Sequence, residues 1–502
     1  MSDAYAALAK ESRSIATLGA VESLLGWDQE TYMPAAGAPL RAEQAGLIAS
    51  MVHERSTSAA FGELIARAEA DPGATGNPRL AASLKRYRRD YDKACKLPGR
   101  LVEELARVGS QSQEAWKRAR AASDFQAFKP WLTKMIALTR EKAACFGTPD
   151  GGEAYDALLD EYEPNARAAD IERVFTPLRT ELTALLGELN RGAHPGTEPL
   201  HVKIEESRQH AFGLFVLEAI GFDLDAGRLD PTTHPFCSGF GPGDTRLTTR
   251  YRDQHFTDAL YSTMHEAGHG LYEQGLPKQD HFGEPLGDSI SLGIHESQSR
   301  LWENLVGRSE AFWEWALPHA KQILGTAIEP FGVRDLYAAV NTATPSLIRV
   351  ESDEATYNMH VMIRFEIERA LFSGSLEAAD VPGVWNEKYR ESLGVEVPDD
   401  ARGCLQDVHW SFGLLGYFPT YTLGNLYAAQ MWEAIRRDLP DLDDRMSRGE
   451  FLGLLGWLRD KVHAVGRQFD AGELCERITG RPLESGPLLR HLAERLKPIY
   501  RV

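Results

Sequence analysis

The chain has 502 residues, which is enough to bury a large core and on length alone suggests two or three domains. Hydrophobic residues make up 43% and charged residues 25%, as in an ordinary water-soluble globular protein. The formal net charge of −18 argues against nucleic acid or an anionic membrane as a partner.

Neither the N-terminus nor the cysteines indicate export or a membrane anchor. The first residues, M-S-D-A-Y-A-A-L-A-K, lack a basic stretch followed by an apolar core, and no apolar run reaches the roughly 20 residues of a membrane span. The five cysteines are scattered and form no C-x-x-C pair, which fits a reducing compartment and argues against a cysteine zinc site. We therefore expect a cytoplasmic protein that contacts no membrane.

Most of the chain has the periodicity of amphipathic helices. Apolar residues recur every three or four positions in Val174–Leu189, Glu366–Phe372 and Thr422–Asp438, and such faces pack into a core. Clusters of Gly and Pro interrupt the pattern at residues 191–199 and 221–244. We find no internal repeat, low-complexity tract or flexible linker, and therefore expect a mainly α fold in a single domain, residues 1–502, with room for two helical lobes.

A small β-sheet is expected just before the most informative helix. The Thr-rich alternation of Thr245–Tyr251 predicts a short strand. The chain then reaches H-E-A-G-H at residues 265–269, with Leu260, Met264 and Leu271 at helical spacing around it. The motif is thus predicted to lie on a helix that follows the sheet.

This H-E-A-G-H sequence predicts a zinc-binding helix that carries its own catalytic base. His265 and His269 are about one turn apart, roughly 6 Å along the helix axis, so both side chains can bind one Zn²⁺. Glu266 lies beside the first ligand, where its carboxylate can take a proton from a zinc-bound water rather than bind the metal. Catalytic zinc usually has three protein ligands, so one more is needed.

The third ligand is expected from a different segment. Tyr272 and Gly275 stand where the extended metzincin pattern needs a glycine and a histidine, which excludes that arrangement. Glu273 is the next acid on the same face, but it lies about 12 Å from His265 along the axis. One helix cannot bring all three side chains to a single ion.

The next predicted helix supplies the best candidates. It covers Leu292–Asn304 and is expected to open near Asp288 or Ser289, which are good N-cap residues. His295 and Glu296 are both candidates, and spacing alone does not choose between them. Weaker candidates from the polar loop before this helix are Asp280, His281 and Glu284.

These residues belong to a series of separated motifs that resembles the Taq-type thermostable carboxypeptidases, a family of metallopeptidases. In chain order the motifs are W-D-Q-E-T-Y-M-P (27–34), H-P-F (234–236), D-T-R-L-T (244–248), H-E-A-G-H (265–269), H-E-S-Q (295–298), I-R-V-E-S-D (348–353), G-C-L-Q-D-V-H-W (403–410) and Y-T-L-G-N-L-Y-A-A-Q (421–430). Ser352 departs from the family pattern, which usually has Ala there. The exchange replaces one small side chain with another.

The resemblance implies both a site and a fold. It implies that His265, His269 and Glu296 bind one Zn²⁺ per chain, which Co²⁺ can replace, and that Glu266 is the general base and acid. It implies a mostly helical gluzincin-type peptidase fold with a long active-site groove, and a homodimer. The implied activity is removal of C-terminal residues from peptide substrates with broad preference.

A carboxypeptidase must recognise a free α-carboxylate, and arginine does this best through a planar two-point contact. Arg349 and Arg246 are the candidates that lie inside motifs. The alternative for either residue is a structural salt bridge, with Glu351, Asp353 or Asp244 as the partner. His234 precedes a proline, which favours an extended backbone, so it can line the groove or cap a loop.

The oxyanion of the tetrahedral intermediate needs a nearby hydrogen-bond donor. His409 can be that donor, with Asp407 orienting it. Tyr417 and Tyr421 offer phenol groups, and by analogy with other gluzincins a His and a Tyr after the zinc site do this work. The alternative for the tyrosines is packing in a Trp- and Phe-rich core.

We therefore expect a zinc-dependent metallocarboxypeptidase. One alternative is an oligopeptidase or dipeptidyl carboxypeptidase on the same scaffold, which product analysis would distinguish. Another is a catalytically inactive peptide-binding protein. Glu266 argues against the latter, because pure binding has no use for a carboxylate beside a metal-bound water.

Overall fold

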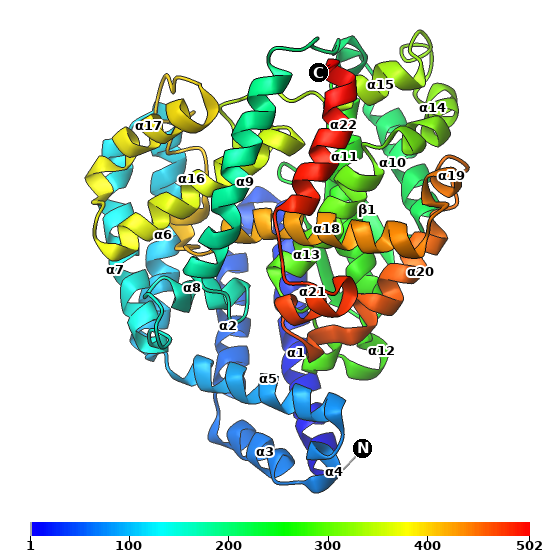
Figure 1. Cartoon of the computed structure of the whole chain (residues 1–502). Helices are drawn as coiled ribbons and strands as arrows, with labels where there is room; N and C mark the ends of the chain where they lie inside the picture. The colour runs from blue at the N-terminus through cyan, green and yellow to red at the C-terminus, as the bar shows by residue number, and fades with distance from the viewer. Residues whose placement is uncertain (1–2) are drawn as a thin grey trace.

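Helices make up most of the structure, a computed structural model that describes residues 3–502 (Figure 1). In the first half of the chain they are α1 (Asp3–Thr31), α2 (Ala38–Ser56), α3 (Ala59–Glu69), α4 (Pro72–Thr75), α5 (Pro78–Cys95), α6 (Gly99–Ala122), α7 (Phe125–Phe146), α8 (Asp156–Tyr162), α9 (Ala168–Leu189) and α10 (Glu206–Ile220). In the second half they are α11 (Phe256–Gly275), α12 (Lys278–His281), α13 (Leu292–Arg300), α14 (Glu310–Leu324), α15 (Val333–Val340), α16 (Glu354–Ser373), α17 (Val381–Leu393), α18 (Pro419–Asp438), α19 (Leu442–Met446), α20 (Leu452–Lys461), α21 (Ala471–Thr479) and α22 (Gly486–Tyr500). The expected mainly α fold is confirmed, and the three predicted amphipathic stretches lie in α9, α16 and α18.

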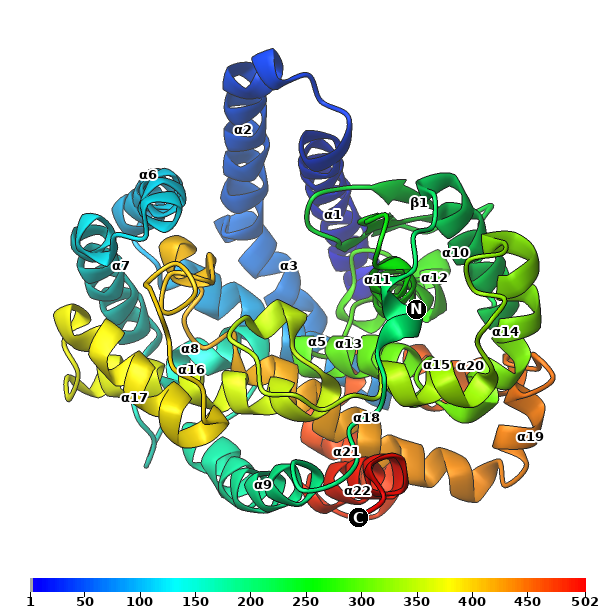
Figure 2. The same ribbon diagram turned by 90° about the horizontal axis from the view of Figure 1, so that it is seen from above.

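Four of the first five helices share a small core of their own. The α1 and α2 pair projects from the rest of the molecule (Figure 2). Buried apolar side chains of α1, α3, α4 and α5 pack together, and Leu286 of the short helix Pro285–Gly287 joins them from the later part of the chain. An ion pair of 2.7 Å between Arg86 on α5 and Asp470 adds a polar link to the later part of the chain. The expectation of one domain with two lobes stays a prediction.

The main core surrounds α18. In Figure 1 this helix crosses behind α9 and α22, which run side by side, and α13, α16 and α21 also contact it. Its residues from Pro419 to Ile435 are buried almost without interruption, so the helix cannot have a wide polar face. Among residues 3–502, no helix has the length and apolar character needed to cross a bilayer.

The small sheet lies before α11, as expected, but it has two strands that were not predicted. Its strands are β1 (Gly227–Pro231), β2 (Cys237–Gly241) and β3 (Asp244–Thr249), in the order β1-β3-β2. β3 is the predicted strand, and it pairs parallel to β1 and antiparallel to β2. The Gly- and Pro-rich composition of β1 and β2 hid them, because such residues are depleted in strands and tolerated mainly at sheet edges.

Two glycines allow the helices of the site to approach one another. A β-carbon added at Gly268 on α11 would lie 2.4 Å from the carbonyl oxygen of Gln298 on α13. One added at Gly424 on α18 would lie 2.5 Å from Cγ of Glu296. Because neither position has room for a side chain, α13 is held closely between α11 and α18.

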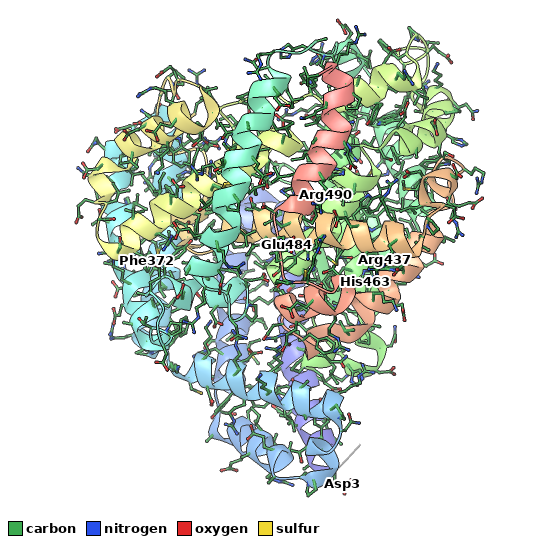
Figure 3. The ribbon with its side chains drawn as sticks, in the orientation of Figure 1. Asp3, Phe372, Arg437, His463, Glu484 and Arg490 are labelled. Carbon is green, nitrogen blue, oxygen red and sulfur yellow. The ribbon has the colours of Figure 1, made fainter. Side chains whose placement is uncertain are left out.

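The end of α11 is also tied to α13. His463, labelled in Figure 3, is fully buried and its Nε2 lies 3.1 Å from Oε1 of Gln298. A β-carbon at Gly275, the last residue of α11, would collide with the His463 ring. This contact links the segment that carries H-E-S-Q to the end of α11.

Candidate metal centre

The two histidines of α11 face a carboxylate of α13. Nε2 of His265 lies 3.6 Å, and Nε2 of His269 lies 3.4 Å, from Oε2 of Glu296. The three ligand atoms lie within 4.8 Å of one another and form the one group of this kind in residues 3–502 that could hold a metal ion. Two imidazole nitrogens and one carboxylate oxygen are a donor set typical of catalytic zinc.

Of the two candidates that spacing left open, Glu296 and not His295 faces the histidine pair. The helix begins at Leu292, with Ser291 as its N-cap accepting a hydrogen bond from Ile294, so it opens a few residues later than predicted. The three weaker loop candidates, Asp280, His281 and Glu284, lie outside the group. His281 and Glu284 instead pair with each other, with Nδ1 3.2 Å from Oε1.

Charged side chains that were not predicted from the sequence contact these residues. Nδ1 of His265 lies 2.8 Å from Oε2 of Glu303, which stands in a π-helical turn, Leu301–Val306, that continues α13. Arg300 donates to Oε1 of Glu296 at 2.7 Å and to Glu303 at 3.2 Å. The spacings of four and three residues between these groups are a helical signal that could have revealed them.

Glu266 is buried beside the histidine pair, with 6% of its surface exposed. Burial raises the pKa of its carboxyl to about 7, because the charged form loses its hydration, although the neighbouring His265 acts in the opposite direction. A carboxyl tuned in this way can both accept and release a proton near neutral pH.

The three expected oxyanion donors lie together. Nε2 of His409 is 3.3 Å from the hydroxyl of Tyr421, and the rings of Tyr417 and Tyr421 meet edge to face at 5.4 Å. Burial, and then the charge of Arg349, lower the pKa of His409 to about 3, so its imidazole is neutral at pH 7. Both tyrosines are only partly buried, and Tyr421 differs in this from most of α18, which is otherwise a core helix.

Asp407 accepts no hydrogen bond from His409, so the expectation that it orients this ring is wrong. Nδ1 of His409 has no hydrogen-bond partner among the described residues. Asp407 instead accepts from Nε of Arg349 at 3.0 Å and from Nε of Arg364 at 2.7 Å. The stronger charge of two buried guanidinium groups attracts the carboxylate more than a neutral imidazole does.

This arrangement leaves excess positive charge at Arg349. Its Nη1 also donates to the hydroxyl of Tyr357 at 2.9 Å, and the residue is only 5% exposed. Glu351 and Asp353, the partners considered from the sequence, do not pair with it. Two arginines share the single carboxylate of Asp407, so the group carries a formal charge of +1.

Arg246 and His234 lie in different surroundings. Arg246 makes a two-point contact with Asp244, 2.9 Å for each bond, and its guanidinium carbon lies 4.4 Å from the ring centre of Trp27 on α1. This pair is formally neutral, and it matches the structural alternative considered for Arg246. His234 is exposed in the link between β1 and β2.

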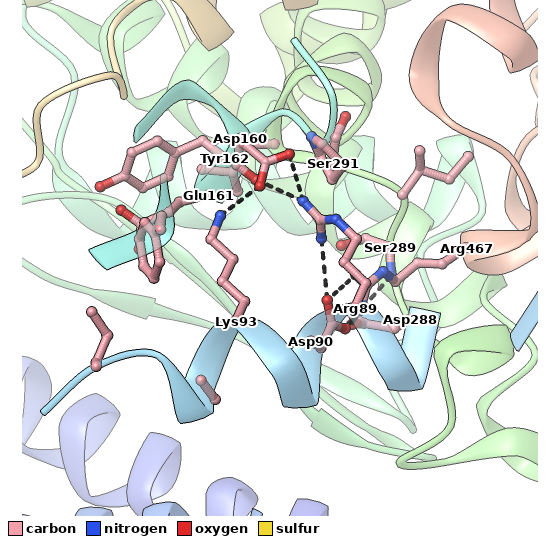
Figure 4. A pocket seen from close by; sticks show the side chains of 16 residues that line it. Arg89, Asp90, Lys93, Asp160, Glu161, Tyr162, Asp288, Ser289, Ser291 and Arg467 are labelled. Carbon is pink, nitrogen blue, oxygen red and sulfur yellow. Dashed lines mark hydrogen bonds and ion pairs between the residues drawn. The ribbon is translucent and has the colours of Figure 1, made fainter. Parts of the chain in front are cut away.

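A cavity of about 440 Å³ with several charged side chains in its wall lies between α5, α8 and the start of α13 (Figure 4). Asp160 accepts from Arg89 at 2.7 Å and from Lys93 at 2.6 Å across it. Tyr162 in its wall has its ring 5.1 Å from that of Tyr417. The cavity therefore extends toward the aromatic residues beside His409. A second cavity of about 500 Å³ adjoins it and shares four of its residues: Asp90, Ala94, Asp288 and Arg467.

Comparisons with known proteins agree with this description. The profile of the carboxypeptidase Taq (M32) metallopeptidase family matches residues 7–496. Thermostable carboxypeptidase 1 of Thermus thermophilus is 44% identical over 99% of both chains, and carboxypeptidase 1 of Bacillus subtilis is 35% identical over 95% of both. The crystal structure of an M32 carboxypeptidase from Deinococcus radiodurans covers the whole of both chains with a TM-score of 0.96 and 40% identity.

The helical fold and the group of metal-binding side chains thus define a metallopeptidase. Since the family profile covers nearly the entire chain and relatives match it end to end, the chain belongs to the carboxypeptidase Taq (M32) metallopeptidase family. It is a metallocarboxypeptidase, that is, a metal-dependent peptide hydrolase.

Proposed function

We propose that this enzyme uses zinc and releases single amino acids from the C-terminal end of peptides, with Glu266 as general base and acid. The observation that carries the proposal is the convergence of His265, His269 and Glu296 beside the buried Glu266. The Nδ1 atoms of both histidines contact other side chains, so their Nε2 lone pairs are free to bind a metal. When bound, zinc polarises the attacking water and the carbonyl of the scissile bond.

The proton transfers fall to Glu266. Its carboxylate accepts a proton from the water as the new C–O bond forms, and then gives that proton to the amine nitrogen as the C–N bond breaks. Burial raises the pKa of this carboxyl above its ordinary value, which favours uptake of the proton from the water.

The negative charge that develops on the carbonyl oxygen needs donors, and His409, Tyr417 and Tyr421 are proposed for this role. Burial raises the pKa of Tyr417, as of Tyr421, above its ordinary value, so both hydroxyls keep their protons at neutral pH. His409 is neutral as well and can donate one N–H. Neutral donors stabilise the transition state without neutralising the metal ligands.

Recognition of the substrate carboxylate is assigned to Arg349. The formal charge of +1 shared by Arg349, Arg364 and Asp407 favours an incoming anion, whereas the Arg246–Asp244 pair is already neutral. Arg246 and His234 are secondary candidates, for contacts with peptide residues that lie farther from the C-terminus.

We also propose that the enzyme is a homodimer in the cytoplasm that binds neither nucleic acid nor a membrane. Most of the exposed large apolar side chains lie on α1, α2 and the segment that connects them. A second copy of the chain would cover them. These side chains are Val21, Leu24, Tyr32, Leu40, Leu47 and Met51.

A time course by mass spectrometry on an unblocked peptide tests the activity. Wild type, Glu266→Gln and chelator-treated protein are compared side by side. We expect a ladder of one-residue losses from the C-terminus in the wild type only. Dipeptide steps or internal fragments would support an oligopeptidase or dipeptidyl carboxypeptidase instead, and no cleavage by zinc-loaded protein would support a peptide-binding protein.

A further inference from the structure

A chain of polar contacts leads away from the metal centre behind His269. Its Nδ1 lies 2.6 Å from Nδ1 of His295, whose Nε2 lies 2.9 Å from Oε1 of Glu273. Oε2 of Glu273 forms an ion pair with Lys278. The exposed fractions of these four side chains are all between 12% and 18%, so the contacts are shielded from solvent.

The geometry determines which atoms carry the protons. Nε2 of His269 faces Glu296 at 3.4 Å, so this nitrogen must be free of hydrogen for the imidazole to bind a metal. The proton of the neutral ring then sits on Nδ1 and is donated to Nδ1 of His295. His295 must in turn carry its own proton on Nε2, which it donates to Glu273.

The charged groups at the far end support this assignment. Burial alone would raise the pKa of Glu273, but the hydrogen bond with His295 and the charge of Lys278 outweigh it and lower the pKa to about 2. Glu273 is therefore a carboxylate and can only accept. The ring of Tyr272 packs 5.2 Å from that of His295 and limits its rotation.

We propose that His295 and Glu273 act in series as positioning residues that hold His269 in the tautomer and orientation needed to bind the metal. This inference rests on the proposed metal site. The other histidine, His265, is held directly by the carboxylate of Glu303, so the two ligands are supported in different ways. The H-E-S-Q motif would thus supply both a ligand, Glu296, and the support of another ligand.

Zinc affinity, measured by competition with a chromophoric chelator, tests the proposal independently of activity. We expect His295→Phe to weaken zinc binding by about 10- to 100-fold, as for other partners of ligating histidines. Glu273→Gln keeps an acceptor but loses the charge, so about a tenfold loss is expected. The double variant should bind zinc no more weakly than His295→Phe alone, because Glu273 acts only through His295.

A matched control is available in the same region. His281 also pairs with a glutamate, Glu284, at 3.2 Å and is 18% exposed, as is His295, but it is not linked to the metal ligands. His281→Phe should leave zinc affinity unchanged. The unfolding temperature of each metal-free variant shows whether the fold is intact, and Glu273→Gln alone provides the test if His295→Phe does not fold.

Wild-type zinc affinity in folded His295→Phe would overturn the proposal, and so would wild-type affinity in folded Glu273→Gln if His295→Phe does not fold. Additive losses of affinity in the double variant would also overturn it. So would a loss in His281→Phe equal to that in His295→Phe. The absorption spectrum of the Co²⁺-loaded protein gives a second readout, which should change in His295→Phe because the position of a ligand changes. If the wild type itself bound no zinc, the proposed function would fail together with this inference. Tight wild-type binding that His295→Phe leaves intact contradicts the inference only.

Discussion

Arg349 and Asp407 form a buried ion pair that joins two motifs 58 residues apart in the chain, with Nε 3.0 Å from Oδ1. The pair closes one side of the site, since the ring of Tyr421 lies 4.9 Å from the Arg349 guanidinium. Because Arg364 shares the same carboxylate, Asp407 balances only one of the two positive charges. The stability of the site and its affinity for an anion therefore depend on the same residues.

Replacement of Asp407 by Asn should destabilise the protein by about 3–5 kcal/mol at pH 7, because it leaves two buried arginines without a counter-charge. Burial alone would raise the pKa of Asp407, but Arg364 and Arg349 hold it well below its usual range. Its contribution to stability is thus complete above the unfolded value of about 3.9 and is lost as the pH falls below it.

Denaturant unfolding of wild type and Asp407→Asn at several pH values checks this prediction. The difference in stability should be constant between pH 7 and about 5 and should narrow below about 4. A difference that grows on acidification, or none at pH 7, would contradict the buried ion pair.

Arg349→Lys should impair recognition of the C-terminal carboxylate while keeping a positive charge at the site. Loss of the two-point contact is expected to lower kcat/KM for an unblocked peptide on the order of 10- to 100-fold, the value of one or two charge-assisted hydrogen bonds. The same peptide with an amidated C-terminus is expected to be cleaved slowly, and the substitution should change kcat/KM for it little.

Arg246→Lys is the matched comparison for Arg349→Lys, because Arg246 is already neutralised by Asp244. Its effect on unblocked peptide should be smaller. If Arg246→Lys gave the larger loss and Arg349→Lys none, the two assignments would have to be exchanged.

The parts of the site that were predicted from the sequence depend on local spacing. His265 and His269 share a helix face whatever the rest of the chain does, so the pair could be found without a structure. The choice of Glu296 over His295 could not be made from the residues alone, because it depends on how α13 is rotated against α11. Close contacts at Gly268 and Gly424 determine that rotation, and they involve distant segments.

Contacts between distant segments also explain the predictions that were wrong or missing. The partner of Asp407 was missed because Arg364 lies on α16 and no local pattern connects the two residues. β1 pairs with β3 although β2 lies between them in the chain, and its Gly- and Pro-containing residues gave no alternation to recognise. Interactions between distant segments thus decided the choice of Glu296, the partners of Asp407 and the pairing of β1 with β3.

The proposed homodimer predicts that charge on α2 will separate the subunits. Leu40 and Leu47 are 60% and 63% exposed, so Glu at both positions should not disturb the fold of one subunit. Light scattering should give twice the chain mass for wild type and the chain mass for the double variant. Leu452→Glu, at a residue 64% exposed on α20, is the control and should remain dimeric. A monomeric wild type would refute the homodimer, and a dimeric double variant would exclude the α1 and α2 surface.

Glu266→Gln should separate proton transfer from metal binding. The substitution keeps the shape of the side chain but removes its ability to accept a proton, so kcat should fall by about 10²- to 10⁴-fold. Zinc affinity should stay the same, because Glu266 is not one of the three converging ligands. Glu296→Gln should behave in the opposite way and lose zinc first. Peptide cleavage and metal content measured on the same samples distinguish the two effects, and a Glu266→Gln variant with near wild-type kcat would show that another group carries the proton.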